Sequence, residues 1–282
     1  MTHSTVKPRS ALTLLETIVV LAILCAGLGL VFAWIQGVRE TSSRLTCQHH
    51  LKELVLAVHL HHDNKGVMPP YASGKHGEIF GGWFVHLMPY LGHGPLYDQL
   101  TSNQHHKTSS GFQLVTSGHS HVQGVTFQEM LCASDPSHAT NDEPRTNYLA
   151  NWYAFSDGVR GAYRPAQPFR NLTDGLSHVV LFAEGYRECN HVPRLAMFSW
   201  PYHNFGITQD GKPSDDPSYA PNDFTMLQIK PSACDIWRSQ TGHAAMPVAL
   251  ADGACRFVAP SIAHDTWKQI LKPRDGNPSS DW

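Results

Sequence analysis

Apolar positions near the N-terminus follow two successive patterns. From Thr17 to Ile35, 19 consecutive residues carry no charge, which gives about 28 Å of helix and is enough to cross the hydrocarbon core of a bilayer. Farther on, apolar residues recur at helical spacing and form one stripe: Cys47, Leu51, Leu54, Val55 and Val58. No proline interrupts either pattern before Pro69, and Gly66 suits a C-terminal cap. We predict one helix from about Leu14 to about Asn64, with an apolar first half and an amphipathic second half.

Beyond this helix the apolar runs are short and are bounded by turn residues. Residues 248–250 and 255–258 read as two strands joined at Asp252-Gly253, where a tight turn needs a positive φ. The turn Thr173-Asp174-Gly175 leads in the same way into a predicted strand from His178 to Ala183. These segments predict an antiparallel sheet.

A second, shorter helix is expected close to the C-terminus. Ser261 is a suitable N-cap, and apolar residues follow at Trp267, Ile270 and Leu271. A long helix followed by strands is an α+β order. We predict a long N-terminal spine helix packed on a mainly antiparallel β-sheet with long loop insertions.

The charge balance limits the choice of partners. Lys and Arg number 21 against 23 Asp and Glu, so there is no basic surplus to neutralise phosphates, and we expect no nucleic-acid partner. Lys7 and Arg9 precede the apolar segment, and basic residues favour the cytoplasmic side of a membrane. We expect a single-pass protein of the inner (cytoplasmic) membrane, with a cytoplasmic N-terminus and an extracytoplasmic C-terminal body.

A cleaved secretory signal peptide is the alternative, with Ala33 before the cleavage point. Two features disfavour it. The apolar run is longer than a usual signal core, and the helical pattern continues beyond it.

The segment "ALTLLETIVVLAIL" resembles the N-terminus of type IV prepilins and type II secretion pseudopilins. In that family a prepilin peptidase cuts the leader, and the new N-terminus is methylated. The resemblance implies cleavage between Ala11 and Leu12 and methylation of Leu12. Ala11 and Leu12 replace the family's usual Gly and Phe.

The same resemblance accounts for Glu16, an acidic residue at the start of the apolar segment. A charge in hydrocarbon is costly unless it is paired. The equivalent pilin glutamate pairs with the N-terminal amine of a neighbouring subunit, which implies an assembly role for Glu16. Alternatively, Glu16 only occupies the lipid headgroup zone.

The rest of the chain resembles a bacterial family that joins a prepilin N-terminus to a large domain of unknown function. The matching segments include "GGWFVHLMPYLGHGPLYDQL", "TNYLANWY" and "FRNLTDGLSHVVLFAEG". The family ends in a His, nine residues and Asp-Gly, whereas here eight residues separate His243 from Asp252-Gly253. The implied organisation is a leader at 1–11, a transmembrane half-helix at 12–35, its amphipathic continuation at 36–66 and an extracytoplasmic β-rich domain at 67–282.

Five cysteines lie beyond the apolar segment, in a compartment where disulfides persist. Cys47 on the spine helix and Cys132 are candidates to link the helix to the body. Cys189 and Cys234 flank the part of the chain that matches the family weakly, and a bond between them would close it. Spacing alone does not fix the connectivity.

No local motif indicates catalysis or a metal site. The run His59, His61, His62, Asp63 and the pair His105, His106 do not converge at ligand spacing, and we expect a solvated polar face. A pairing of His243 with Asp252 across the hairpin is a minor alternative to a structural role. We therefore expect no enzyme, no cofactor and no metal.

The sequence as a whole favours a membrane-anchored pseudopilin-like structural subunit that assembles through its N-terminal helix. Its partners would be prepilin peptidase, membrane lipid, and other pilin-like subunits or a secretion or pilus assembly platform. The competing hypothesis is an extracytoplasmic binding or enzymatic module that uses the helix only as an anchor.

Overall fold

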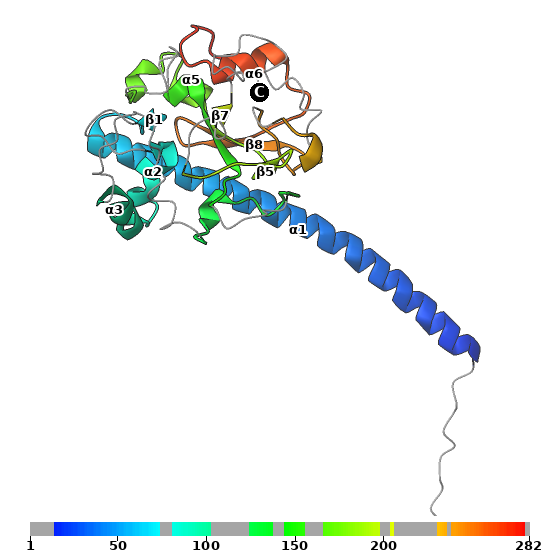
Figure 1. Ribbon diagram of the computed structural model, residues 1–282. Helices are drawn as coiled ribbons and strands as arrows, with labels where there is room; N and C mark the ends of the chain where they lie inside the picture. The colour runs from blue at the N-terminus through cyan, green and yellow to red at the C-terminus, as the bar shows by residue number, and fades with distance from the viewer. Residues whose placement is uncertain are drawn as a thin grey trace, which may run out of the picture. The chain divides into compact units, whose positions relative to one another are not determined.

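The structure, a computed structural model, divides into two compact units, residues 1–42 and 43–282 (Figure 1). It describes residues 14–73, 81–102, 124–137, 144–155, 166–197, 204–205, 230–235 and 238–279.

The predicted long helix is confirmed. Helix α1 runs without a break from Leu14 to Lys65. Gly66 ends it with a φ of 74°, and the Gly66 N–H donates a hydrogen bond to the carbonyl of His62 at 2.7 Å. This left-handed residue closes the last turn and satisfies one carbonyl that the helix would otherwise leave without a donor.

The first unit presents apolar side chains to its surroundings. Large apolar residues between Leu14 and Val38 are exposed, and Leu14 itself is 82% exposed. Among the described residues, α1 is the one helix that is long and apolar enough to cross a membrane. It could serve as a single-pass membrane anchor.

The second unit is built around a five-stranded sheet. Its strands, in spatial order, are β7 (Asn204–Phe205), β3 (Tyr148–Asn151), β4 (Val180–Glu184), β8 (Met246–Leu250) and β9 (Cys255–Val258). All neighbouring pairs are antiparallel except β3 with β7. The α+β class with a mainly antiparallel sheet is therefore confirmed.

Smaller elements surround this sheet. Two short antiparallel pairs join β1 (Ala72–Ser73) to β2 (Gly81–Gly82) and β5 (Glu188–Cys189) to β6 (Val192–Pro193). The short helices are α2 (Trp83–Leu87), α3 (Gly94–Ser102) and α5 (Trp152–Phe155). Single 3-10 turns are η1 (Met88–Tyr90), η3 (Gln128–Met130), η4 (Phe169–Asn171), η5 (Leu176–His178) and η7 (Pro231–Ala233).

Both faces of the sheet are buried, each against a helix. The predicted stripe of α1, from Cys47 to Val58, is fully buried and its aliphatic members share one core with Ala150 and Ala249 of the sheet. Alternate strand residues, such as Leu149 and Val248, share a second core with α6 (His264–Leu271). The sheet therefore lies between residues 43–65 of α1 and α6 (Figure 1).

The C-terminal helix begins later than predicted. Its N-cap is Ala263 rather than Ser261, and Asp265 in the first turn complements the positive end of the helix dipole. The predicted apolar residues Trp267, Ile270 and Leu271 are buried as expected. Ser261 was the wrong N-cap because it lies in a separate turn before the helix, which the Ile262 N–H closes with a hydrogen bond to the Ala259 carbonyl.

The predicted hairpin is confirmed as β8 and β9, with Gly253 at a φ of 86° in the turn. The strand expected from His178 instead begins at Val180, because residues 176–178 form η5. Gly175, with a φ of 96°, makes the predicted turn ahead of it.

Candidate functional site

A buried polar cluster lies where the second unit's part of α1 meets the sheet. Cys47, Cys132, Glu184 and His243 each offer one donor atom, and these four atoms lie within 4.8 Å of one another. The most exposed of the four residues, Cys132, is only 6% exposed. A nitrogen, an oxygen and two sulfurs thus converge in a site closed to solvent.

The secondary structure places two of these side chains. Cys47 is the first fully buried residue along α1 and begins the stripe that faces the sheet. Glu184 is the last residue of β4, where side chains alternate between the two faces. Ala183 belongs to the core under α6, so Glu184 faces α1. Tyr148 of β3 pairs with Glu184 of the neighbouring strand β4. Its hydroxyl donates a hydrogen bond to the Cys47 carbonyl at 3.4 Å.

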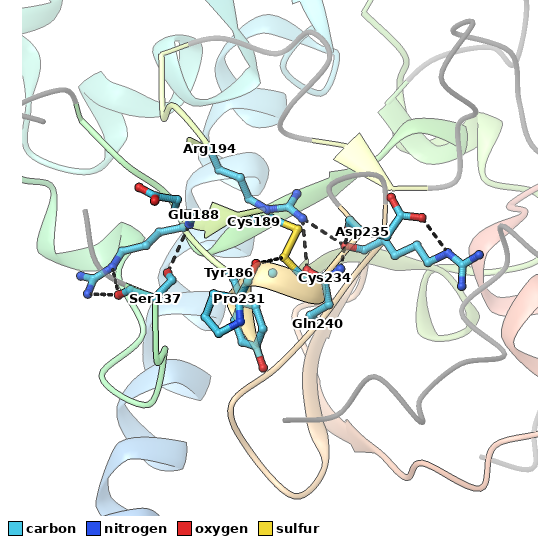
Figure 2. Close-up of a disulfide and its surroundings, with 12 residues drawn as sticks. Ser137, Tyr186, Glu188, Cys189, Arg194, Pro231, Cys234, Asp235 and Gln240 are labelled. Atoms are coloured by element: carbon cyan, nitrogen blue, oxygen red, sulfur yellow. Dashed lines mark hydrogen bonds and ion pairs between the residues drawn. A yellow bond between two sulfur atoms is a disulfide. The ribbon is translucent and has the colours of Figure 1, made fainter. Parts of the chain in front are cut away.

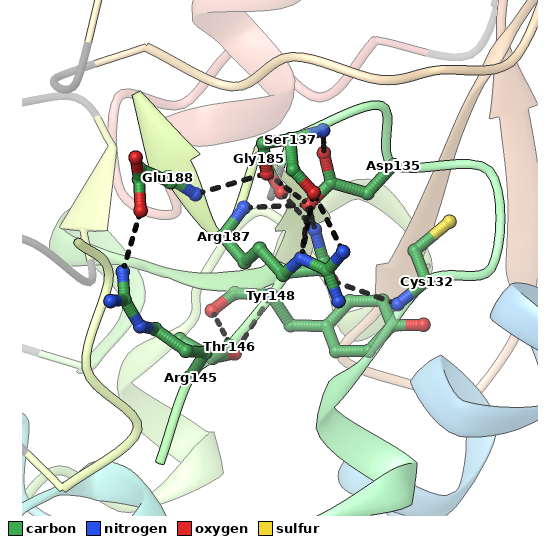
Figure 3. A network of polar contacts seen from close by, with 10 residues as sticks. Cys132, Asp135, Ser137, Arg145, Thr146, Tyr148, Gly185, Arg187 and Glu188 are labelled. Atoms are coloured by element: carbon green, nitrogen blue, oxygen red, sulfur yellow. Dashed lines mark hydrogen bonds and ion pairs between the residues drawn. The ribbon is translucent and has the colours of Figure 1, made fainter. Parts of the chain in front are cut away.

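A hydrogen-bonded loop positions Cys132. The Asp135 carboxylate accepts hydrogen bonds from the Asn147 side chain at 2.6 Å and from the Arg187 backbone N–H at 2.9 Å. Asn147 in turn accepts a hydrogen bond from the Cys132 N–H at 2.9 Å. Figure 3 shows this network, with the Cys132 sulfur pointing away from it. The loop is therefore held to the residue before β3 and to the segment after β4.

The chain before β8 positions His243. The Thr241 hydroxyl donates to Glu184 Oε2 at 2.5 Å and accepts from the His243 N–H at 3.1 Å, so it ties both cluster residues together. Gly242 lies against the Cys132 loop. A Cβ at this position would meet the Ser134 carbonyl oxygen at 2.0 Å. Only glycine allows this close approach, which brings His243 next to Cys132.

The His243 ring is the common neighbour of the other three cluster residues. Its Nε2 lies 3.3 Å from Cys132 Sγ, 3.4 Å from Cys47 Sγ and 3.8 Å from Glu184 Oε1. Among the described residues, Glu184 Oε1 has no hydrogen-bond partner although it is buried. A buried carboxylate oxygen without a donor is costly.

The environment separates the pKa values of these groups. Burial raises the pKa of Glu184 to about 8, and the nearby Cys47 adds to that rise. The hydrogen bond between the two thiols lowers the pKa of Cys47 and, together with burial, raises that of Cys132. Cys47 is therefore the first of the two thiols to ionise, and Glu184 keeps its proton to unusually high pH.

One predicted disulfide is confirmed and one is wrong. Cys189 and Cys234 are bonded, with their Cα atoms 5.5 Å apart (Figure 2). Cys47 and Cys132 are free thiols. They are neighbours as expected, but each sulfur lies within hydrogen-bonding distance of the His243 ring and is not bonded to the other sulfur.

Two residues of the His243–Asp252-Gly253 motif contact α1, and the third shapes the turn beside it. Asp252 accepts a hydrogen bond from the Ala254 N–H at 2.8 Å and shapes the hairpin turn. Lys52 of α1 donates to the Gly253 carbonyl at 2.5 Å. Asp252 is exposed whereas His243 is fully buried in the cluster, so the alternative of a His243–Asp252 pair is wrong.

The histidines at the end of α1 pack instead of forming the expected solvated face. His61 is 6% exposed and its Nδ1 lies 2.9 Å from the Val67 carbonyl oxygen. The rings of His59 and His62 each lie 4.6 Å from the ring of Phe169. These aromatic contacts, absent from the local sequence pattern, explain the error. The pair at 105–106 lies outside the described residues.

The processing residues Ala11 and Leu12 also lie outside the described residues. Glu16 lies in the first turn of α1. An acidic side chain there complements the positive end of the helix dipole.

Sequence reasoning found three of the four cluster residues but not the cluster. Cys47, Cys132 and His243 were singled out for other reasons, and Glu184 was not singled out because the predicted strand ended at Ala183. The expectation of no metal rested on local ligand spacing. The four residues come from separate segments, so local spacing carries no signal of their convergence.

Comparison with family models matches residues 36–265 to a family described as "Protein of unknown function (DUF1559)". The match covers most of the chain and includes all four cluster residues. Comparisons with curated proteins and with solved structures found no match.

Proposed function

The chain belongs to the DUF1559 family, and from that premise we propose that it is a pilin-like structural subunit, anchored in the inner membrane and assembled through the first part of α1. The body lies on the extracytoplasmic side. The leader is removed by prepilin peptidase between Ala11 and Leu12, and Leu12 is methylated. The protein is not an enzyme.

The observation that carries the proposal is the combination of α1's exposed apolar surface with one acidic residue in its first turn. The large apolar side chains from Leu14 to Val38 need a cover of lipid or of neighbouring helices. Glu16 begins this segment. A carboxylate at that depth is retained only where it has a partner, and the ammonium of a neighbouring subunit's Leu12 is the partner we propose.

The second part of α1 supports the same function. Its buried stripe packs on the sheet through Leu51, Leu54 and Val55, and Lys52 and His59 hydrogen-bond to the β8–β9 turn. The second part of α1 is therefore built into the core of the body, as a pilin-like spine helix requires.

Replacing Glu16 with alanine tests the proposal. We expect Glu16→Ala to leave the protein folded and inserted, since losing the charge favours insertion by about 2–3 kcal/mol. It should strongly reduce crosslinking between subunits in the native membrane, because a buried ammonium would be left unpaired. Crosslinked species are measured at equal protein levels.

Glu40→Ala is the matched control, because Glu40 is an acidic residue of the same helix beyond the apolar segment. It should crosslink like the wild type. Equal crosslinking of Glu16→Ala and wild type would contradict the assembly role and favour a helix that serves only as an anchor.

A further inference from the structure

We propose that Cys47, Cys132, Glu184 and His243 bind a structural zinc ion that joins α1 to the sheet. The inference concerns the body alone and does not depend on how the membrane segment assembles.

The geometry fits one tetrahedral ion. Zinc bonds of about 2.3 Å to sulfur and about 2.0–2.1 Å to nitrogen or oxygen place neighbouring ligand atoms about 3.4–3.8 Å apart. The His243 Nε2 atom lies 3.3 Å, 3.4 Å and 3.8 Å from the other three donors. Two thiolates, an imidazole and a carboxylate are also a donor set that zinc accepts.

One oxygen atom of the buried Glu184 carboxyl group lacks a hydrogen-bond partner among the described residues. Within the part of the chain that the structure describes, its one ion-pair partner is His243, at 3.8 Å. Its Oε2 is held by Thr241 at 2.5 Å, while Oε1 has no hydrogen-bond donor among the described residues. Oε1 is the atom that faces the cluster, and a metal ion there would supply the missing partner.

The surrounding contacts resemble those that orient metal ligands. Thr241 fixes the carboxylate and also accepts the His243 N–H, and Asn147 holds the backbone of Cys132. Supporting hydrogen bonds of this kind orient metal ligands before the ion binds. Gly242 brings the two segments close enough for both to reach the ion.

The site is closed, which indicates a structural role. All four ligand positions are filled by protein, and all four residues are buried. A catalytic zinc keeps one position open for water or substrate. The ligands come from α1, the 131–137 loop, β4 and the segment before β8, so one ion would link four parts of the body.

A disulfide between Cys47 and Cys132 is the competing state, since both thiols lie beyond the membrane segment. It would leave Glu184 Oε1 without a partner and would use neither His243 nor the carboxylate. Zinc uses all four groups and, by holding both sulfurs as thiolates, keeps them apart.

Metal analysis of the purified full-length protein in detergent, prepared without chelators or a histidine tag, tests the proposal. We expect about one zinc per chain after exhaustive dialysis. Both thiols should resist alkylation until zinc is removed. Replacement by Co(II) should give the thiolate charge-transfer and visible bands of tetrahedral sulfur ligation.

Variants locate the ion. Cys132→Ser should lower zinc occupancy at least about tenfold, and Glu184→Gln, which keeps a hydrogen bond to Thr241, should weaken zinc affinity at least about tenfold. Cys255→Ser, which changes a free cysteine outside the cluster, should retain zinc. Because Cys132→Ser could fail to fold, the alkylation and cobalt measurements on wild type stand independently.

Three results would overturn the proposal. The wild-type protein could be folded yet bind neither zinc nor cobalt. Peptide mapping could show Cys47 and Cys132 bonded to each other as isolated. Zinc could also remain at full occupancy in folded Glu184→Gln and Cys132→Ser, which would place the ion elsewhere.

Discussion

His86 lies on α2 with its ring partly buried, 6.4 Å between centroids from the ring of His61. Burial lowers the pKa of His86 to about 3, and the nearby His61 contributes. The pKa of His61 is also lowered by burial. Both rings are therefore neutral in the folded body, and neither is a pH sensor at neutral pH.

This pair makes the body sensitive to acid. Between about pH 6.5 and 3 the unfolded chain binds a proton at His86 that the folded protein does not, so stability falls as the pH falls through that window. The loss approaches about 1.4 kcal/mol per pH unit for one group. We expect His86→Gln to show a smaller decrease in unfolding temperature than wild type between pH 7 and pH 5.

His49→Gln is the control, because this histidine lies on α1 with 68% of its side chain exposed. Comparing the two variants separates the loss of the buried ring from the loss of a histidine in general. A pH dependence of His86→Gln that equals that of wild type would contradict the assignment.

At the scale of elements, β5 is held to η7 by the Cys189–Cys234 disulfide (Figure 2). Tyr186 packs against the two cysteines in a small core of its own. The bond closes a loop between two cysteines that are 45 positions apart in the sequence. This cross-link restricts the unfolded chain, and it lies apart from the two cores that cover the sheet.

Removing this bond should destabilise the body without changing its fold. We expect the double variant Cys189→Ser, Cys234→Ser to lose about 2–4 kcal/mol of unfolding free energy. Denaturant unfolding under non-reducing conditions measures the difference. Cys255→Ser, a change at a free cysteine, should lose much less, and equal losses in both variants would contradict a specific contribution of the disulfide.

Elements with a continuous local pattern could be predicted from the sequence. The α1 stripe and the β8–β9 hairpin each follow from residues that are neighbours along the chain. The parallel pairing of β7 with β3 could not, because Asn204 and Ala150 meet only through tertiary contacts. The irregular register of β4 against β8, between Val180 and Phe182, likewise has no local signal.

For the candidate site, residue types were visible in the sequence but their convergence was not. Cys47 was read as part of a helix stripe, and the predicted strand stopped at Ala183, one residue before Glu184. Their meeting depends on the packing of α1 on one face of the sheet and on Gly242, which lets the His243 segment approach Ser134. These are properties of the folded body.

The molecule as a whole combines a helix suited to a membrane with a body fixed to its second part. Helix α1 passes through both units. Its first part is exposed and apolar, and its second part is buried against the sheet. The same element thus carries both the proposed assembly residue, Glu16, and the proposed zinc ligand, Cys47.

The intact mass of the protein purified from its native membrane tests the proposed pilin-like function most directly. We expect the mass of residues 12–282 with one added methyl group on Leu12, because under the proposed function prepilin peptidase removes the leader and the new N-terminus is methylated. A mass that corresponds to the uncut chain, or to cleavage near Ala33, would contradict the proposed function.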